Sequence, residues 1–194
     1  MTRTQKLNKC TEGDYRELFV TWSEPLHWLC YTLTGDEGLS EKMLEAALEQ
    51  SLKGADQVFR GWMVSWARRL IIKACIHTVQ PWKSLLAHEP LPVLPLSAAS
   101  LETNLDVALS LPARVLREGL LMQDVLARFV FVLRAIEGYS RRETSLLLNI
   151  DDRLCEWVYV RTARTLNKNA ESFEAVNFIS FVGENSCEAA LAGD

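Results

Sequence analysis

Apolar residues recur at spacings of three and four positions along residues 14–33. This period predicts a helix that turns one apolar side toward a core. Pro25 either kinks that helix or starts a second one, because proline supplies no backbone N–H. The sequence Thr34-Gly35-Asp36 is expected to end it. The apolar stripe consists of Tyr15, Leu18, Phe19, Trp22, Leu26, Leu29, Cys30 and Leu33.

The next helix is predicted to begin at Ser40 and to be amphipathic. Its outer side is mostly acidic and holds Glu41, Lys42, Glu45 and Glu49. Its inner side holds Met43, Leu44, Ala47, Leu48, Ser51 and Leu52.

Residues 59–73 combine four basic and three large aromatic residues with no acid. They are Arg60, Arg68, Arg69 and Lys73, and Phe59, Trp62 and Trp66. On a helix, Trp62, Trp66 and Arg69 would share one line, so that aromatic faces lie beside cations. Stacking of an unpaired base on such a ring is worth roughly 1–3 kcal/mol, and cations hold the neighbouring phosphates. The alternative is that both tryptophans belong to a core and the arginines are only solvated.

Between His77 and Leu111 the composition changes, and four prolines exclude a continuous helix. They are Pro81, Pro90, Pro92 and Pro95. The pattern predicts a stiff linker, extended at about 3.1 Å per residue, between two helical units. Helical periodicity resumes after Pro112, which suits the first turn of a helix.

A dense apolar block, residues 129–136, leads to Gly138, which can take the left-handed backbone that closes a helix. Ser140 and Glu143 have the spacing of a capping box and predict the start of a short helix. Its buried side is expected to be Leu146, Leu147 and Leu148, with a corner at Asn149-Ile150. Asp151 is then placed to cap a third helix that runs through Asn167. Two short helices at a tight corner are typical of a helix-turn-helix, whose second helix can lie in a major groove of DNA.

The third of these helices is expected to turn a mixed set of side chains outward. The set expected outward or partly outward is Arg153, Glu156, Trp157, Val160, Arg161 and Arg164, and the candidates for the inner side include Leu154, Cys155, Val158 and Leu166. Arg141, Arg142 and the arginines of this helix could grip a phosphate backbone, whereas Asp151, Asp152 and Glu156 would repel it. The alternative is a helix-turn-helix that serves only as a packing module.

Composition agrees with a globular chain, since 48% of the 194 residues are hydrophobic and 24% are charged. The net charge of −4 argues against a protein that coats nucleic acid indiscriminately. The polar start lacks a signal-peptide core and no apolar run approaches the roughly 20 residues of a membrane span, so a cytoplasmic protein is expected.

Sites for catalysis are not apparent in the sequence. The five cysteines form no C-x-x-C pair and are expected to be reduced and mostly buried, and the three histidines lie in separate segments without metal-ligand spacing. We therefore expect neither an enzyme nor a bound metal or cofactor.

Two separated stretches resemble one protein family, the extracytoplasmic-function sigma factors of bacterial RNA polymerase. The resemblance rests on Leu18-Phe19, Pro25-Leu26, Tyr31–Asp36, Phe59–Trp62 and Ala67-Arg68, and then on Phe131–Ser140, Glu143, Leu148–Ile150 and Arg161–Leu166. It implies an all-α protein with a region 2-like bundle (14–77), a Pro-rich linker (78–111) and a region 4-like helix-turn-helix domain (112–168), flanked by tails (1–13 and 169–194).

The same resemblance implies that the chain binds core RNA polymerase, directs it to promoter DNA, and has an anti-sigma factor as a further candidate partner. The helix that opens the promoter would use Arg60, Trp62, Trp66, Arg68, Arg69 and Lys73. The helix-turn-helix would use Arg141, Arg142, Arg153, Glu156, Trp157, Arg161 and Arg164. The polymerase clamp would meet Lys42, Met43, Glu45 and Glu49. Lys42–Ala46 replace the family's Asp-Leu-Val-Gln-Glu-like signature, which leaves as alternative a degenerate sigma-like module that binds a protein in place of DNA.

Overall fold

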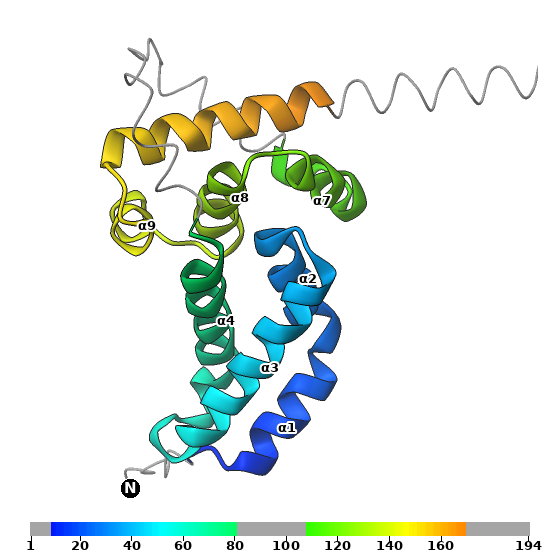
Figure 1. Ribbon diagram of the computed structural model, residues 1–194, viewed down its shortest axis with the longest axis vertical. Coiled ribbons are helices and arrows are strands. Elements are labelled where there is room, and N and C mark those ends of the chain that lie inside the picture. The colour runs from blue at the N-terminus through cyan, green and yellow to red at the C-terminus, as the bar shows by residue number, and fades with distance from the viewer. Residues whose placement is uncertain (1–8, 81–107, 170–194) are drawn as a thin grey trace, which may run out of the picture. The chain divides into compact units, whose positions relative to one another are not determined.

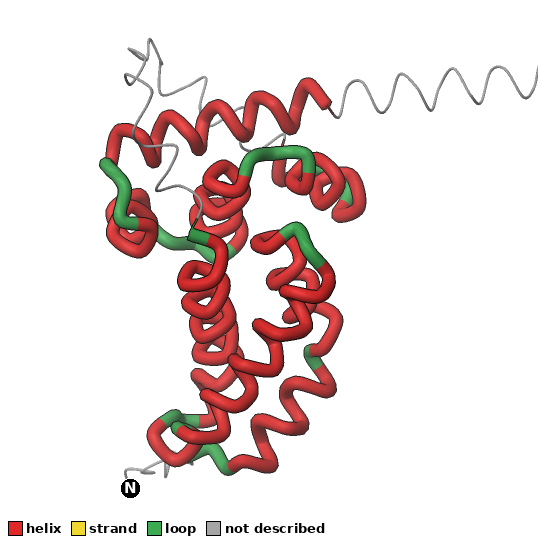
Figure 2. The backbone as a smooth tube through the Cα atoms, viewed as in Figure 1, coloured by secondary structure: helices red, strands yellow, loops and turns green. Residues whose placement is uncertain are grey.

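The computed structural model of the chain describes residues 9–80 and 108–169 (Figure 1). Within these two ranges every regular element is helical and none is a strand, so the predicted all-α class is confirmed (Figure 2). The chain divides into two compact units, Met1–Glu89 and Pro90–Asp194. Most of the predicted linker and nearly all of the 169–194 tail lie outside the described residues.

Over residues 9–80 the first unit contains four α-helices: α1 (Glu12–Thr21), α2 (Ser23–Thr34), α3 (Glu37–Lys53) and α4 (Met63–Val79). Two short 3-10 turns, η1 (Ala55–Gln57) and η2 (Arg60–Trp62), join α3 to α4. Leu26, Leu29, Leu33 and Ile71 are fully buried, and they form the apolar interior around which the helices pack.

The unit begins earlier than its hydrophobic pattern indicates. Thr11 caps α1, because its hydroxyl accepts from the Asp14 N–H at 3.3 Å and the Asp14 carboxylate accepts from the Thr11 N–H at 2.7 Å. The preceding Cys10 is buried, and its N–H donates to the Val58 carbonyl at 2.8 Å. The prediction that residues 1–13 form a tail is therefore wrong for the last of these residues.

The three boundaries predicted between residues 14 and 40 have different outcomes. The stripe over residues 14–33 forms two helices that break at Trp22, and Pro25 lies in the first turn of the second. Gly35 ends α2 with φ 71°, as expected. The predicted start of α3 at Ser40 is wrong, because Asp36 caps the helix by accepting from the Leu39 N–H at 2.8 Å. Ser40 is buried one turn further along, where its hydroxyl donates to the Asp36 carbonyl at 2.6 Å.

The second unit contains α7 (Ala113–Leu121), α8 (Val125–Phe131), a π-helical turn η3 (Val132–Ile136), α9 (Arg141–Leu148) and a helix over residues 152–169. Pro112 stands directly before α7 as its cap. Phe129, Phe131 and Leu133 are fully buried and form the centre of this unit's core.

The helix-turn-helix has the predicted local geometry. Gly138 has φ 74°, and the capping box is present, with the Glu143 N–H donating to Ser140 Oγ at 3.2 Å and the Ser140 N–H donating to the Glu143 carboxylate at 2.8 Å. Asn149 ends α9 in the left-handed conformation with φ 53°. Asp151 then caps the following helix by accepting from the Arg153 N–H at 2.7 Å.

The predicted buried side of α9 is wrong for two of its three leucines. Leu146 is 72% exposed and Leu147 is 42% exposed, and only Leu148 is buried. Thr144 and Ser145 take the inward positions. Three consecutive residues spread over most of the helix circumference, so they cannot all face one core.

Candidate nucleic-acid interface

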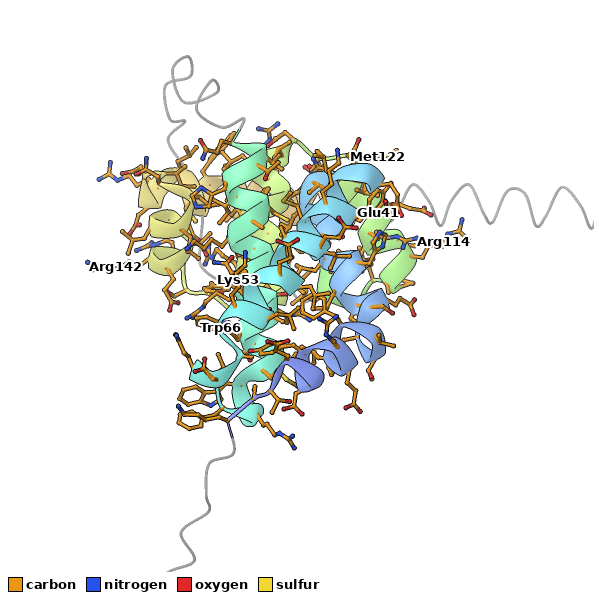
Figure 3. All side chains as sticks on the ribbon, turned by 60° about the horizontal axis from the view of Figure 1, so that its bottom comes forward. Glu41, Lys53, Trp66, Arg114, Met122 and Arg142 are labelled. Atoms are coloured by element: carbon orange, nitrogen blue, oxygen red, sulfur yellow. The ribbon has the colours of Figure 1, made fainter. Side chains whose placement is uncertain are left out.

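An aromatic and cationic stripe runs along the exposed side of α4. Trp62 is 68% exposed and Trp66 is 37% exposed, and Arg69 and Lys73 are exposed as well. We call these four residues the α4 stripe: Trp66, Arg69 and Lys73 are spaced by three and four positions and follow one line of α4, and Trp62 lies in the turn directly before the helix. The side chain of Trp66 stands at the surface (Figure 3). The alternative that both tryptophans belong to the core is therefore wrong.

The local sequence explains why the stripe faces outward. Ala67, Leu70, Ile71 and Cys75 of α4 are buried, and they occupy the opposite side of the helix. Trp62 lies in the 3-10 turn before α4 and is held by an edge-to-face contact with Phe59, with ring centroids 6.0 Å apart. The ring is thereby fixed at the surface.

Two other members of the predicted promoter-melting set have different surroundings. The Arg60 guanidinium donates to Asp14 Oδ1 at 2.7 Å and so connects η2 to α1. The hydrogen bonds from Thr11 and the charge of Arg60 hold the pKa of Asp14 below its usual value. Arg68 is half-buried. Arg60 is thus exposed but held by an acid of its own unit, and Arg68 is less accessible than Arg69 and Lys73.

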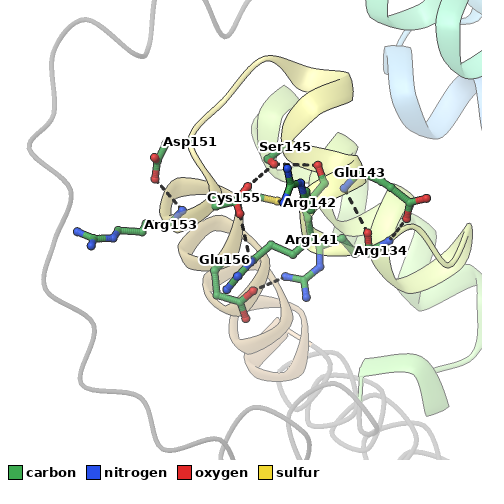
Figure 4. Close-up of polar contacts among 11 residues, drawn as sticks. Arg134, Arg141, Arg142, Glu143, Ser145, Asp151, Arg153, Cys155 and Glu156 are labelled. Carbon is green, nitrogen blue, oxygen red and sulfur yellow. Dashed lines mark hydrogen bonds and ion pairs between the residues drawn. The ribbon is translucent and has the colours of Figure 1, made fainter.

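In the second unit, the three acids near the corner of the helix-turn-helix all have partners within the protein (Figure 4). Asp151 caps the helix that follows it. Asp152 accepts a short hydrogen bond from Ser145 and lies 3.8 Å from Arg141 Nε. Glu156 accepts from Arg134 Nη1 at 2.8 Å. The repulsion of a nearby phosphate by Asp152 and Glu156 is weaker than the sequence indicates, because a neighbouring arginine offsets the charge of each.

The ion pair of Glu156 is also partly shielded from water, with Arg134 and Glu156 side chains 17% and 25% exposed. The Arg134 guanidinium carbon lies 3.9 Å from the ring centroid of Tyr159, which adds a cation–π contact. The prediction that Glu156 faces outward to bind DNA therefore meets a competing structural role. The sequence offered no local signal for Arg134 as its partner.

The predicted cations of the helix-turn-helix lie at the surface. Arg141, Arg142, Arg153, Arg161 and Arg164 are exposed. Trp157 is half-buried, and the Arg161 guanidinium carbon lies 5.0 Å from its ring centroid. Val160, in contrast, is only 2% exposed, so its predicted outward position is wrong. Its neighbours cover it because it lies over the core side of the helix.

A groove of about 250 Å³ opens along helix 152–169, and we call it the helix groove. Trp157 and Val160 supply apolar surface, and Arg161 and Arg164 supply positive charge. Among the described residues its lining is Trp157, Val160, Arg161, Arg164, Thr165 and Lys168. The groove thus joins an apolar floor to a cationic rim, and none of these six lining residues is an acid.

The predicted polymerase-binding residues lie on α3. Lys42, Glu45 and Glu49 are exposed, whereas Met43 is half-buried and its sulfur accepts from the Thr78 hydroxyl at 3.2 Å. Beside Glu45 an open groove of about 520 Å³ lies between α3 and the α1–α2 corner. Its lining is Phe19, Ser23, Glu24, Leu26, His27, Leu44, Glu45 and Leu48. Sequence periodicity did not reveal this groove, because it treats Leu44 and Leu48 as ordinary core residues.

The described parts of the chain hold no cluster of three or more histidine, cysteine or acidic side chains that could bind a metal ion. His27 instead lies 3.0 Å from Glu37. Cys10, Cys30, Cys75 and Cys155 are buried free thiols, as predicted, whereas Cys187 lies outside the described residues. A hydrogen bond with Cys75, together with burial, raises the pKa of Cys30, which disfavours a reactive thiolate there.

None of the helices in residues 9–80 and 108–169 combines the length and the apolar character that a bilayer crossing requires. Comparison with protein families finds no family model that matches the chain, and comparison with curated proteins finds no match either.

Proposed function

We propose that this chain is a sigma factor-like transcription initiation protein that binds core RNA polymerase and directs it to promoter DNA. Its role is recruitment and promoter recognition, with no catalytic step of its own. The proposal starts from the sequence resemblance to extracytoplasmic-function sigma factors. The observation that carries it furthest is the α4 stripe, where Trp62 and Trp66 are exposed beside Arg69 and Lys73.

The chemistry of the α4 stripe fits an unpaired DNA strand. Large exposed aromatic rings are costly in water, and stacked bases cover them at a gain of roughly 1–3 kcal/mol per base. Arg69 and Lys73 continue the same line and can neutralise the phosphates that follow the stacked bases. A helix that only needed solvation on this side would be served by polar residues in place of Trp62 and Trp66.

The second unit supplies a surface for duplex DNA. α9 and helix 152–169 meet at the left-handed Asn149; Arg141, Arg142 and Arg153 are exposed at the starts of these two helices, and Arg161 and Arg164 are exposed further along helix 152–169. Since Glu156 is paired with Arg134, the remaining exposed charge of the predicted DNA-binding set is positive. Phosphate contacts by such arginines give affinity and orientation, while side chains near the start of the helix read base edges.

For polymerase docking, α3 offers an acidic outer face beside the 520 Å³ groove. Leu44 and Leu48 provide apolar contact area, and Glu45 lies at the same groove. An apolar contact flanked by charge has the anatomy of a protein interface. We assign core polymerase to this side and DNA to the α4 stripe.

A direct test uses the full chain and a fluorescent single-stranded oligonucleotide. Trp62→Ala and Trp66→Ala are each expected to weaken binding at least fivefold, because each removes a stacking surface worth roughly 1–3 kcal/mol. Trp22→Ala is the matched control, since Trp22 is 39% exposed but lies outside the α4 stripe. Equal losses in all three variants, or no loss at Trp62 and Trp66, would refute the role of the α4 stripe.

The second candidate is a sigma-like module that binds a protein partner and no promoter. It is favoured by α3, where Lys42 and Glu45 replace the polar residues of the family's clamp-binding signature. Co-elution with core RNA polymerase, followed by salt-dependent binding to a promoter library, separates the two candidates. A stable complex that selects promoters supports the first, and failure at both steps supports the second.

A further inference from the structure

The helix groove has a composition that calls for a particular occupant. Its floor includes Trp157 and the nearly buried Val160, and its rim carries Arg161 and Arg164. A cavity of about 150 Å³ is enough to hold benzene. The helix groove, at about 250 Å³, therefore has room for an aromatic side chain. A suitable occupant brings aromatic residues and negative charge together.

The sequence that directly follows helix 152–169 has this composition. Residues 170–194 contain five acids and no lysine or arginine, and their apolar residues are concentrated in 173–182. The apolar residues are Phe173, Val176, Phe178, Ile179, Phe181 and Val182, and the acids are Glu171, Glu174, Glu184, Glu188 and Asp194. Glu171 and Glu174 flank Phe173, so the acids nearest the helix groove accompany an aromatic ring.

We propose that residues 171–182 bind in the helix groove of their own chain, with phenylalanine rings against Trp157 and Val160 and with Glu171 and Glu174 beside Arg161 and Arg164. The contact is a built-in competitor for the surface assigned to DNA. The competition, unlike the docking itself, rests on the proposed function.

The length of the chain permits this contact. From residue 169 back to Trp157 the helix rises about 1.5 Å per residue, or roughly 18 Å over twelve residues. An extended chain covers up to about 3.3–3.6 Å per residue, so the nine residues from 169 to Phe178 can span roughly 30 Å. This leaves enough chain to reverse direction and to run back along the helix groove.

Tethering also makes the contact effective. A segment joined to its site by a few residues has an effective concentration in the millimolar range, so even weak docking is well populated. Part of the attraction is between charges, so added salt should weaken the binding of the segment to the helix groove. The effect is expected between about 0.1 M and about 1 M salt, where the Debye length falls from about 10 Å to about 3 Å. Salt therefore weakens both the binding of residues 171–182 and the binding of DNA to the same arginines.

Docking is tested by a photo-crosslinking amino acid, benzoylphenylalanine, placed at Phe178 in the full chain. Crosslinks are expected to fall on the peptide that contains Trp157–Lys168 and to lose at least threefold in yield with Arg161→Ser plus Arg164→Ser. The same crosslinker at Leu191 is the matched control, because that residue lies outside the apolar stretch. An equal mixture of unlabelled and 15N-labelled chains distinguishes contacts within a chain from contacts between chains.

Each crosslinking result either supports or overturns the proposed docking. Crosslinks within one chain to the helix groove support the proposal, and crosslinks to other peptides, between chains, or at equal yield from Leu191 overturn it. Competition is measured separately, as duplex DNA affinity of the full chain with Phe178→Ser plus Phe181→Ser, which adds no charge. We expect the duplex DNA affinity of this variant to be at least fivefold higher than that of the parent chain. If the crosslinks form in the helix groove but neither this variant nor its parent binds DNA, docking stands and the proposed DNA function fails.

Discussion

Arg134 and Glu156 form an ion pair at 2.8 Å that connects the π-helical turn η3 to helix 152–169. Tyr159, one turn along the same helix, lies beneath the Arg134 guanidinium. The pair neutralises the charge of Glu156, which is the one acid in the predicted DNA-contacting set. It also fixes the orientation of helix 152–169 within its unit.

Loss of this ion pair should lower the free energy of unfolding without lowering the affinity for duplex DNA. Breaking a fully buried pair costs about 3–5 kcal/mol, and the partial exposure of these side chains reduces the expected cost for Glu156→Ala to about 1–3 kcal/mol. Duplex affinity should not fall, because the change leaves an extra positive charge. Urea unfolding measures the first effect, and a double-mutant cycle with Arg134→Met isolates the pair. A loss of duplex affinity without a change in stability would instead favour base contact by Glu156.

Local patterns predicted the helices well, and contacts between distant residues account for the errors. The capping box at Ser140 and Glu143 depends on only four consecutive residues, and the structure contains it as predicted. Asp36 and Ser40 are both good cap residues, and the burial of Ser40 beside Thr34, to which it is hydrogen-bonded, decides between them. A capping-box spacing at Thr11 and Asp14 was present in the sequence and could have located the start of α1.

In the candidate site, too, local patterns were predicted correctly and contacts between distant residues were not. Periodicity placed Trp62, Trp66 and Arg69 on one line, but it could not say whether that line faced water. The burial of Ala67, Ile71 and Cys75 on the other side of α4 settles it. The pairing of Glu156 with Arg134 joins residues 22 positions apart, which no local rule anticipates.

The reassignment of α9 predicts different costs for neighbouring leucines. Leu146→Gln should change the free energy of unfolding by no more than about 0.5 kcal/mol, because its side chain is largely in water. Leu148→Ala should cost about 2–4 kcal/mol, since it leaves a cavity in the core. Urea denaturation of both variants provides the comparison. Similar costs at the two positions would restore the original prediction of three buried leucines.

Close packing between α7 and helix 152–169 predicts a penalty at a glycine. A Cβ added at Gly119 would lie 2.8 Å from Leu166 Cδ2, and Leu166 is itself buried. Gly119→Ala should therefore destabilise the chain by about 1–3 kcal/mol, although alanine normally favours a helix. Gly38→Ala is the matched control in α3, where the nearest atom would be 3.5 Å away. Leu166→Ala in the Gly119→Ala background should show strong coupling, and simple additivity would count against the contact.

The buried thiol of Cys155 predicts a pH dependence at the alkaline end. Burial raises the pKa of this thiol to about 11. A folded-state pKa above the unfolded value of about 8.5 means that the stabilisation is complete below that value and is lost as the pH rises toward the folded pKa. The unfolding free energy should fall by about 2–3 kcal/mol more in the parent than in Cys155→Ala between pH 8 and pH 11. Parallel pH curves for the two proteins would show that Cys155 ionises normally.

The arginines of the second unit can be sorted by the salt dependence of duplex binding. Arg153 and Arg161 are exposed, so Arg153→Ala and Arg161→Ala should each reduce the slope of log affinity against log salt by about one, as expected when one phosphate contact is lost. Arg134 provides the matched control, because it is 17% exposed and is paired with Glu156. Arg134→Met should lower stability and leave the slope nearly unchanged. If all three variants had the same slope as the parent, the helix-turn-helix would not grip a phosphate backbone, and the protein-binding alternative would gain support. If Arg134→Met alone changed the slope, the ion pair must open when DNA binds, which places Arg134 and not Arg161 at the phosphate.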